Sequence, residues 1–151
     1  MTGVQTCALP ILASQIVGID HVGIAVPDLD EALTFYVGQL GLRLTHREAN
    51  PEQLIEEAML ADAGSGVALQ LIAPTHPESA IARFLDKRGP GLQQIAYRVH
   101  NIDTACAAAT AAGLRLVYDS PCTGTLASRI NFIHPASTGG VLIELVEPAS
   151  N

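Results

Sequence analysis

The sequence of this chain repeats itself once. Each half carries an apolar run, then an apolar residue followed by aspartate, then Gly-Leu-Arg-Leu, then a second apolar run interrupted by one polar residue. The matching stretches are residues 20–26 and 93–99, 29–30 and 102–103, 41–44 and 113–116, and 67–71 and 141–145. Two alike halves of this kind predict two alike structural units packed as layers.

Polar residues stand at equivalent places in the two halves. His21 and Gln94 lie in the first apolar run of each half, 73 residues apart, and Gln70 and Glu144 interrupt the last run. Imidazole nitrogens and amide or carboxylate oxygens are donors to metal ions. The repeat relates the four residues by a pseudo-twofold axis, and this arrangement predicts a metal site.

Composition excludes several classes of function. The chain has 151 residues, enough for one domain with a substantial core. Its net charge of −7, with only eight Lys and Arg, gives no basic footprint for nucleic acid or an anionic membrane. Three cysteines without metal-type spacing predict reduced thiols in a cytoplasmic protein.

The first fifteen residues match neither half of the repeat. They contain no Lys or Arg, so they lack the basic start of a secretion signal, and they are too short and too polar to span a bilayer. Residues 3–11 resemble a translated sequencing adapter. We therefore expect residues 1–15 to be a non-native or disordered leader, and deletion of residues 1–14 to leave the melting temperature and the metal content unchanged.

Apolar periodicity and turn residues predict the same order of elements in each half, strand-helix-strand-strand-strand. Asp28 is the expected N-cap of the first helix, and a linker helix over residues 77–85 is expected to begin at its Pro-Glu-Ser sequence. The predicted elements are strands 16–26, 42–48, 56–61 and 67–73 with a helix from 28 to 40, the linker helix after 77, then strands 92–99, 114–118, 129–134 and 141–147 with a helix over 102–112.

The expected fold class is α+β, with two tandem βαβββ modules forming a curved mixed sheet around a metal-binding cleft. Residues 16–148 would form a single domain, with module one over 16–74, a linker helix within 75–91 and module two over 92–148. Strand side chains alternate between faces, so the four polar residues can share the cleft only if their apolar neighbours point under the helices.

At these residues the chain resembles the vicinal oxygen chelate superfamily, which includes glyoxalases, bleomycin resistance proteins and dioxygenases. Within it, the chain is similar to the epimerases that act on methylmalonyl-CoA. The stretches that carry the resemblance are residues 20–25, 28–30, 35–36, 52–53, 57–60, 70–74, 78–79, 87–89, 95–97, 128–132, 134–135 and 139–145.

The resemblance implies that His21, Gln70 and Glu144 are metal ligands and that Glu57 is an acid/base residue. The fourth ligand position departs from the family pattern, because the family carries His where this chain carries Gln94. An amide oxygen is a weaker donor than imidazole to cobalt, nickel or zinc, so preference should move toward manganese or magnesium.

The implied activity is that of an isomerase, which interconverts (2R)- and (2S)-methylmalonyl-CoA by metal-assisted two-base transfer of the α-proton. Glu57 and Glu144 are the candidate bases, and which of them serves which enantiomer stays open. Glu57 follows Glu56 and can equally belong to a solvated acidic face. An acyl-CoA substrate and a homodimer are also implied.

Two other functions fit the same fold. One is a different enzyme, such as a glyoxalase-like isomerase or a polyketide-pathway enzyme, because the fold hosts many chemistries. The other is a small-molecule-binding protein without catalysis. The retained ligand-type residues and Glu57 favour an enzyme, as does the small number of aromatic residues available to line a binding cleft.

Overall fold

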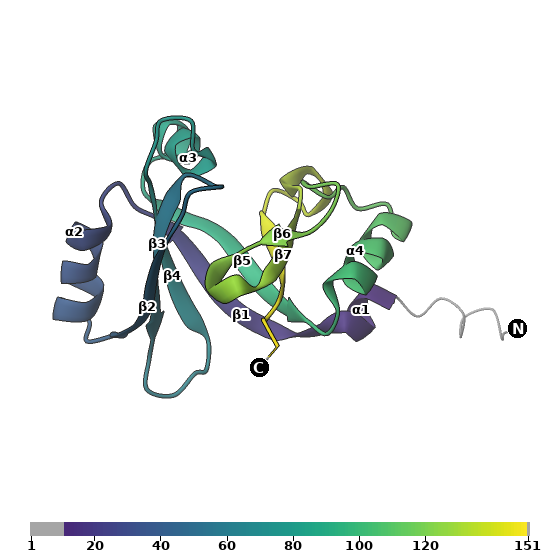
Figure 1. The fold of residues 1–151 in the computed structure, drawn as a ribbon, viewed down its shortest axis with the longest axis horizontal. Coiled ribbons are helices and arrows are strands. Elements are labelled where there is room, and N and C mark those ends of the chain that lie inside the picture. Colours follow the sequence, from purple (N-terminus) through teal and green to yellow (C-terminus); the bar gives the residue numbers. More distant parts are fainter. Residues whose placement is uncertain (1–10, 151) are drawn as a thin grey trace, which may run out of the picture. The chain divides into compact units, whose positions relative to one another are not determined.

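The computed structural model describes residues 11–150. Figure 1 shows their helices and strands in chain order. The elements are α1 (Ile11–Gln15), β1 (Ile16–Ala25), α2 (Leu29–Leu33), η2 (Thr34–Gln39), β2 (Arg43–Asn50), β3 (Ile55–Ala61), β4 (Ala68–Pro74), α3 (Ala80–Arg88), β5 (Gly91–Val99), α4 (Ile102–Ala111), β6 (Cys122–Thr123), η3 (Thr125–Ala127), β7 (Arg129–Ile133), η4 (Pro135–Ser137) and β8 (Ile143–Glu147).

These residues form two compact units. The first unit is Ile19–Ala96, and the second unit combines residues 11–18 with residues 97–150. In the first unit the strand order is β2-β3-β4-β1, with β1 and β4 parallel and the other described pairs antiparallel. In the second unit β8-β7-β6 are antiparallel neighbours. The α+β class and the repeated βαβββ order predicted from the sequence are confirmed.

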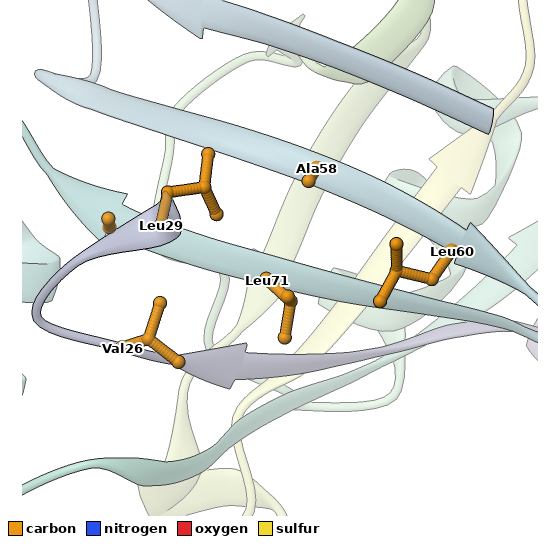
Figure 2. Close-up of a cluster of buried hydrophobic side chains, with 6 residues drawn as sticks. Val26, Leu29, Ala58, Leu60 and Leu71 are labelled. Carbon is orange, nitrogen blue, oxygen red and sulfur yellow. The ribbon is translucent and has the colours of Figure 1, made fainter. Parts of the chain in front are cut away.

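One face of the first unit's sheet is an apolar core under α2. Asp28 caps this helix, because its Oδ1 accepts a hydrogen bond of 2.9 Å from the backbone N–H of Glu31. Leu29 from the helix then packs against buried side chains of β3 and β4 (Figure 2). The buried members of this cluster are Val26, Leu29, Ala58, Leu60, Leu71 and Ala73.

On the opposite face of the same sheet, α3 covers an apolar cluster. Ser79 caps α3 by accepting a hydrogen bond from the N–H of Ile81, as its position in the sequence predicts. Ile81 packs on three buried residues of β1, β3 and β4, namely Ala25, Ile55 and Ile72. Side chains two positions apart on a strand lie on the same face. On this face, the residue two positions after Ile55 and the residue two positions before Ile72 are polar, and they belong to the candidate site.

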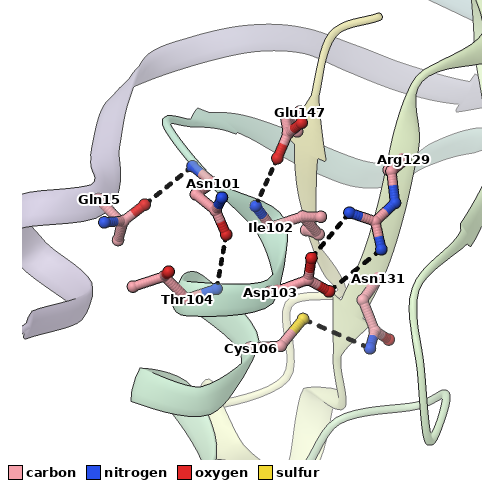
Figure 3. Close-up of polar contacts among 9 residues, drawn as sticks. All are labelled: Gln15, Asn101, Ile102, Asp103, Thr104, Cys106, Arg129, Asn131 and Glu147. Atoms are coloured by element: carbon pink, nitrogen blue, oxygen red, sulfur yellow. Dashed lines mark hydrogen bonds and ion pairs between the residues drawn. The ribbon is translucent and has the colours of Figure 1, made fainter.

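The second unit has its core between α4 and β7–β8. Val99, Ile102, Ala105, Cys106, Ile133 and Leu145 form its buried cluster. Figure 3 shows the polar contacts at the start of α4. The side chain of Asn101 accepts a hydrogen bond from the N–H of Thr104, and the side chain of Glu147 accepts one from the N–H of Ile102. The guanidinium of Arg129 forms an ion pair with the carboxylate of Asp103. The Arg129 guanidinium is the main cause of the lowered pKa of Asp103.

The predicted strand over residues 114–118 is wrong. Only Leu116 forms a bridge, to Ile133, and the first strand after α4 is the two-residue β6. The reason lies in Asn131, which is fully buried. Its Oδ1 accepts from the backbone N–H of Tyr118 at 3.1 Å and its Nδ2 donates to the carbonyl of Tyr118 at 3.0 Å. A side chain thus takes backbone groups that a strand ladder would otherwise use.

The expected leader differs from the structure at its last five residues. Residues 1–10 lie outside the described residues, but residues 11–15 form helix α1. Leu12 packs against the core of the second unit. The carbonyl of Gln15 accepts from the N–H of His100 at 3.0 Å, and its Oε1 accepts from the N–H of Asn101 at 2.9 Å. The expectation of disorder does not hold for residues 11–15, whereas the effect of deleting residues 1–14 stays a prediction.

A chain that begins at Ile16 should therefore be less stable than one that begins at Ile11. The shorter chain loses the contacts of Leu12 and both hydrogen bonds of Gln15, which should lower the melting temperature by about 4–10 °C. Thermal unfolding of the two truncated proteins, followed by circular dichroism, measures the difference. Equal melting temperatures would show that α1 does not stabilise the fold.

No helix among residues 11–150 is long and apolar enough to cross a membrane.

Candidate active site

Four of the five predicted site residues come together in the first unit. His21 lies on β1, Glu57 on β3, Gln70 on β4 and Gln94 on β5. All four are buried, with between 3% and 7% of each residue exposed. They lie on the face of the sheet opposite α2, and their contacts form one continuous chain of hydrogen bonds.

Strand register explains why these residues share a face. Gln70 pairs with Gly23 of β1 and with Met59 of β3. His21 is two residues before Gly23, and Glu57 is two residues before Met59, so all of these positions point to the same side of the sheet. The intervening residues point into the apolar core under α2. The sequence-based expectation about the two faces is therefore confirmed for the first unit.

Gly23 provides the space in which the Gln94 side chain lies. A Cβ at position 23 would stand 2.7 Å from Cγ of Gln94, which is closer than such contacts allow. Because Gly23 carries no side chain, Gln94 crosses β1 and reaches Gln70 on the next strand. A glycine here is thus a requirement of the site.

Asp20 sets the orientation and the tautomer of the His21 ring. Its Oδ2 lies 2.7 Å from Nδ1 of His21. A carboxylate accepts the Nδ1 hydrogen, so the neutral imidazole presents Nε2 with its lone pair. An imidazole held by a carboxylate in this way is the usual arrangement of a metal-ligating histidine.

The two glutamines continue the chain from His21 to Glu57. Nε2 of Gln94 lies 3.4 Å from Nε2 of His21 and donates to Oε1 of Gln70 at 3.0 Å. Gln70 in turn donates from Nε2 to Oε2 of Glu57 at 3.0 Å. Burial of Glu57 decides against the solvated acidic face, because only 3% of the residue is exposed. Glu56 points to the other side, within 3.8 Å of the exposed Arg47.

These residues fit a weakly held cation. His21 Nε2 and Gln70 Oε1 face one point, and Gln94 adds a third donor when its amide turns its oxygen to that point. Among residues 11–150, no group of three His, Cys, Asp or Glu side chains is placed to hold a metal. The first unit thus offers one nitrogen and two neutral oxygens, a donor set with little charge to attract a metal ion.

Glu144, the fifth predicted residue, belongs to the second unit. It lies on β8 opposite Phe132 of β7 and is buried, with 5% of the residue exposed. Its neighbour Leu145 points into the core under α4. Glu144 therefore lies on the face away from the helix of its unit, as Gln70 does in the first unit.

Sequence reasoning assigned no role to Asp20 and Gly23. The signals were present: a carboxylate directly before a candidate ligand, and a glycine two residues after it on the same strand face. Neither signal is decisive without the strand register, because alternation alone does not say which side chain of β5 crosses β1.

Comparison with known proteins agrees with this fold. The sequence model of the Glyoxalase/Bleomycin resistance protein/Dioxygenase superfamily matches residues 20–132, and the chain belongs to this superfamily. A solved structure of methylmalonyl-CoA epimerase from Mycobacterium tuberculosis is 55% identical, with a TM-score of 0.87 over 90% of this chain and 91% of that one.

Two further relatives are epimerases of the same kind. A variant of methylmalonyl-CoA epimerase from Streptomyces coelicolor, in complex with 2-nitronate-propionyl-CoA, is 40% identical, with a TM-score of 0.84 over 89% of this chain and 99% of that one. An ethylmalonyl-CoA/methylmalonyl-CoA epimerase from Cereibacter sphaeroides is 30% identical over 84% of this chain and 95% of its own length.

Proposed function

We propose that this protein is an isomerase that interconverts (2R)- and (2S)-methylmalonyl-CoA. The observation that carries the proposal is the buried Glu57 carboxylate, which accepts a hydrogen bond from Gln70 at one end of the hydrogen-bonded chain whose other end is the imidazole of His21. The likeness to epimerases at up to 55% identity supports the same substrate class, an acyl-CoA with a carboxylate on its α-carbon.

Glu57 would act on the α-proton of the substrate. Its carboxylate takes the proton as the Cα–H bond breaks, and the bonding electrons pass into the enolate of the thioester. Protonation on the opposite face of the same carbon then gives the other epimer. For that second proton transfer we propose Glu144, which the sequence assigns from the repeat and the family pattern. Glu144 would start this step protonated, so the turnover would end with Glu57 protonated and Glu144 ionised, and proton exchange with water would reset both carboxyl groups.

A divalent metal ion is the proposed cofactor, held by His21, Gln70, Gln94 and Glu144. When bound, such an ion stabilises the negative charge that develops on the thioester oxygen of the enolate. Cobalt, manganese, nickel, zinc and magnesium are all candidates. The two amide oxygens favour the harder ions among them. We also propose a homodimer and a cytoplasmic location, which follow from the family resemblance and the reduced cysteines.

The assay that tests this function starts from one pure epimer. The purified protein, with manganese or cobalt added, should convert (2S)-methylmalonyl-CoA into an equal mixture with the (2R) form, separated by coupling to an epimer-specific enzyme. A protein that binds the thioester without converting it would be a binding protein. Isomerisation of a glutathione hemithioacetal without epimerisation would identify a glyoxalase-like enzyme.

A further inference from the structure

We propose that the side-chain amide of Gln94 takes the place of a cation between His21 and Gln70. The folded first unit then satisfies its buried polar groups through its own side chains, and a metal ion adds little to its stability. This inference concerns the architecture of the ligand set. It does not rest on the reaction proposed above.

The two ends of the hydrogen-bonded chain fix its direction. At one end Asp20 accepts from Nδ1 of His21 at 2.7 Å, which leaves Nε2 as an acceptor. At the other end Glu57 accepts from Nε2 of Gln70 at 3.0 Å, which directs Oε1 of Gln70 toward Gln94. The carboxylates of Asp20 and Glu57 thus direct two acceptor atoms, one on His21 and one on Gln70, toward the side chain between them.

Gln94 meets both acceptors with one atom. Its Nε2 lies 3.4 Å from Nε2 of His21 and 3.0 Å from Oε1 of Gln70. A carboxamide nitrogen carries two hydrogens, so it donates one to each neighbour. A metal ion at this point would bind the same two atoms. The amide nitrogen is therefore the neutral equivalent of that ion.

Histidine at this position, as the family pattern has it, would behave differently. A neutral imidazole carries one N–H where the carboxamide carries two, so at least one of the two hydrogen bonds seen here is lost. Losing a hydrogen bond within a buried cluster lowers the stability of the fold. A bound metal ion restores this stability, because it attracts the lone pairs of His21 Nε2 and Gln70 Oε1. For the native Gln94, by contrast, binding a metal requires the amide to turn and to give up both bonds. Metal affinity and stability gained from metal should therefore both be low.

The test compares four forms of the full chain: wild type, Gln94→His, Gln94→Met and Gln93→His. Melting temperatures are measured in EDTA and in excess cobalt, and bound cobalt is measured by elemental analysis after gel filtration. Methionine has a length similar to glutamine but lacks both N–H donors. Gln93→His adds a histidine to the opposite face of β5 and controls for unspecific binding of cobalt.

In EDTA, Gln94→His and Gln94→Met should melt about 3–8 °C below wild type. Cobalt should restore Gln94→His, which should retain the ion through gel filtration. It should move wild type, Gln94→Met and Gln93→His by less than about 2 °C. A Gln94→His protein that folds only with cobalt would agree with the proposal, and Gln94→Met would then supply the comparison in EDTA.

Three results would overturn the proposal. These are a Gln94→Met protein as stable as wild type in EDTA, a Gln94→His protein as stable as wild type in EDTA, or a wild-type gain from cobalt as large as that of Gln94→His. None of these readouts depends on turnover. A negative epimerase assay would therefore leave the inference about Gln94 intact. A negative result in the melting and cobalt measurements would leave the epimerase assignment intact.

Discussion

Replacing Glu57 with glutamine is expected to lower the turnover of methylmalonyl-CoA by about 10²-fold or more. Glutamine has the shape of glutamate, and its Oε1 can still accept the hydrogen bond that Gln70 donates to Oε2 of Glu57 at 3.0 Å. The substitution thus removes a proton acceptor while it preserves the surrounding contacts. Steady-state kinetics at saturating substrate measure the loss, and the melting temperature should stay close to that of wild type.

Glu56→Gln is the matched control for this substitution. Glu56 is the preceding residue of β3 and points to the other face of the sheet, beside the exposed Arg47. Its loss removes one negative charge from the same strand, yet turnover should stay within about twofold of wild type, because surface ion pairs contribute little. Equal activity of Glu57→Gln and Glu56→Gln would remove Glu57 from the mechanism.

Replacing Glu144 with glutamine should have the second large effect, again about 10²-fold or more on turnover. The sequence assigns this residue two roles, as a ligand and as the second base, and the structure shows it buried on β8. A carboxylate is costly to bury, so its retention in an apolar strand indicates a chemical role. The dissociation constant for manganese, already high in wild type, should also rise in this variant, because the proposed site would lose a charged ligand.

Glu147→Gln provides the comparison on the same strand. Glu147 accepts a hydrogen bond from the N–H of Ile102 at the start of α4, and its substitution removes a negative charge from the N-terminus of that helix, which lowers stability by about 0.3–1 kcal/mol. Its turnover per folded molecule and its dissociation constant for manganese should match wild type. If Glu144→Gln also changed only the melting temperature, Glu144 would be a structural residue, and the second proton transfer would need another group.

The alternating pattern of the strands made most of the fold predictable. In β4 the single polar residue, Gln70, interrupts an apolar run, and alternation puts its neighbours Leu69 and Leu71 on the face under α2. Capping chemistry placed the start of α2 at Asp28 and the start of α3 at residues 77–79, of which Ser79 is the N-cap in the structure. These signals are local, so the sequence is sufficient to recognise them.

The errors arose where a contact between distant segments decided the structure. Residues 114–118 alternate as a strand would, but the buried Asn131 takes the backbone groups of Tyr118. Residues 11–15 match neither repeat, yet they form α1 because Gln15 meets His100 and Asn101 across the second unit. The sequence periodicity within either segment does not predict a contact with a residue so distant in the chain.

The candidate site shows the same division. Residue types and the repeat predicted His21, Gln70 and Gln94 as one set, and the strand register brings them together. The direction of each amide could not be predicted, because it depends on Asp20 and Glu57 at the two ends of the chain of hydrogen bonds. That direction determines which atoms face a metal.

Proton exchange in deuterated water tests the central claim most directly. Wild-type protein incubated in D₂O with (2S)-methylmalonyl-CoA alone should produce the (2R) epimer with deuterium at the α-carbon, detected by mass spectrometry after the epimers are separated. Glu57→Gln should incorporate deuterium at least about 10²-fold more slowly, whereas Glu56→Gln should match wild type. Formation of the (2R) epimer without deuterium, or undiminished exchange in Glu57→Gln, would contradict removal of the α-proton by Glu57.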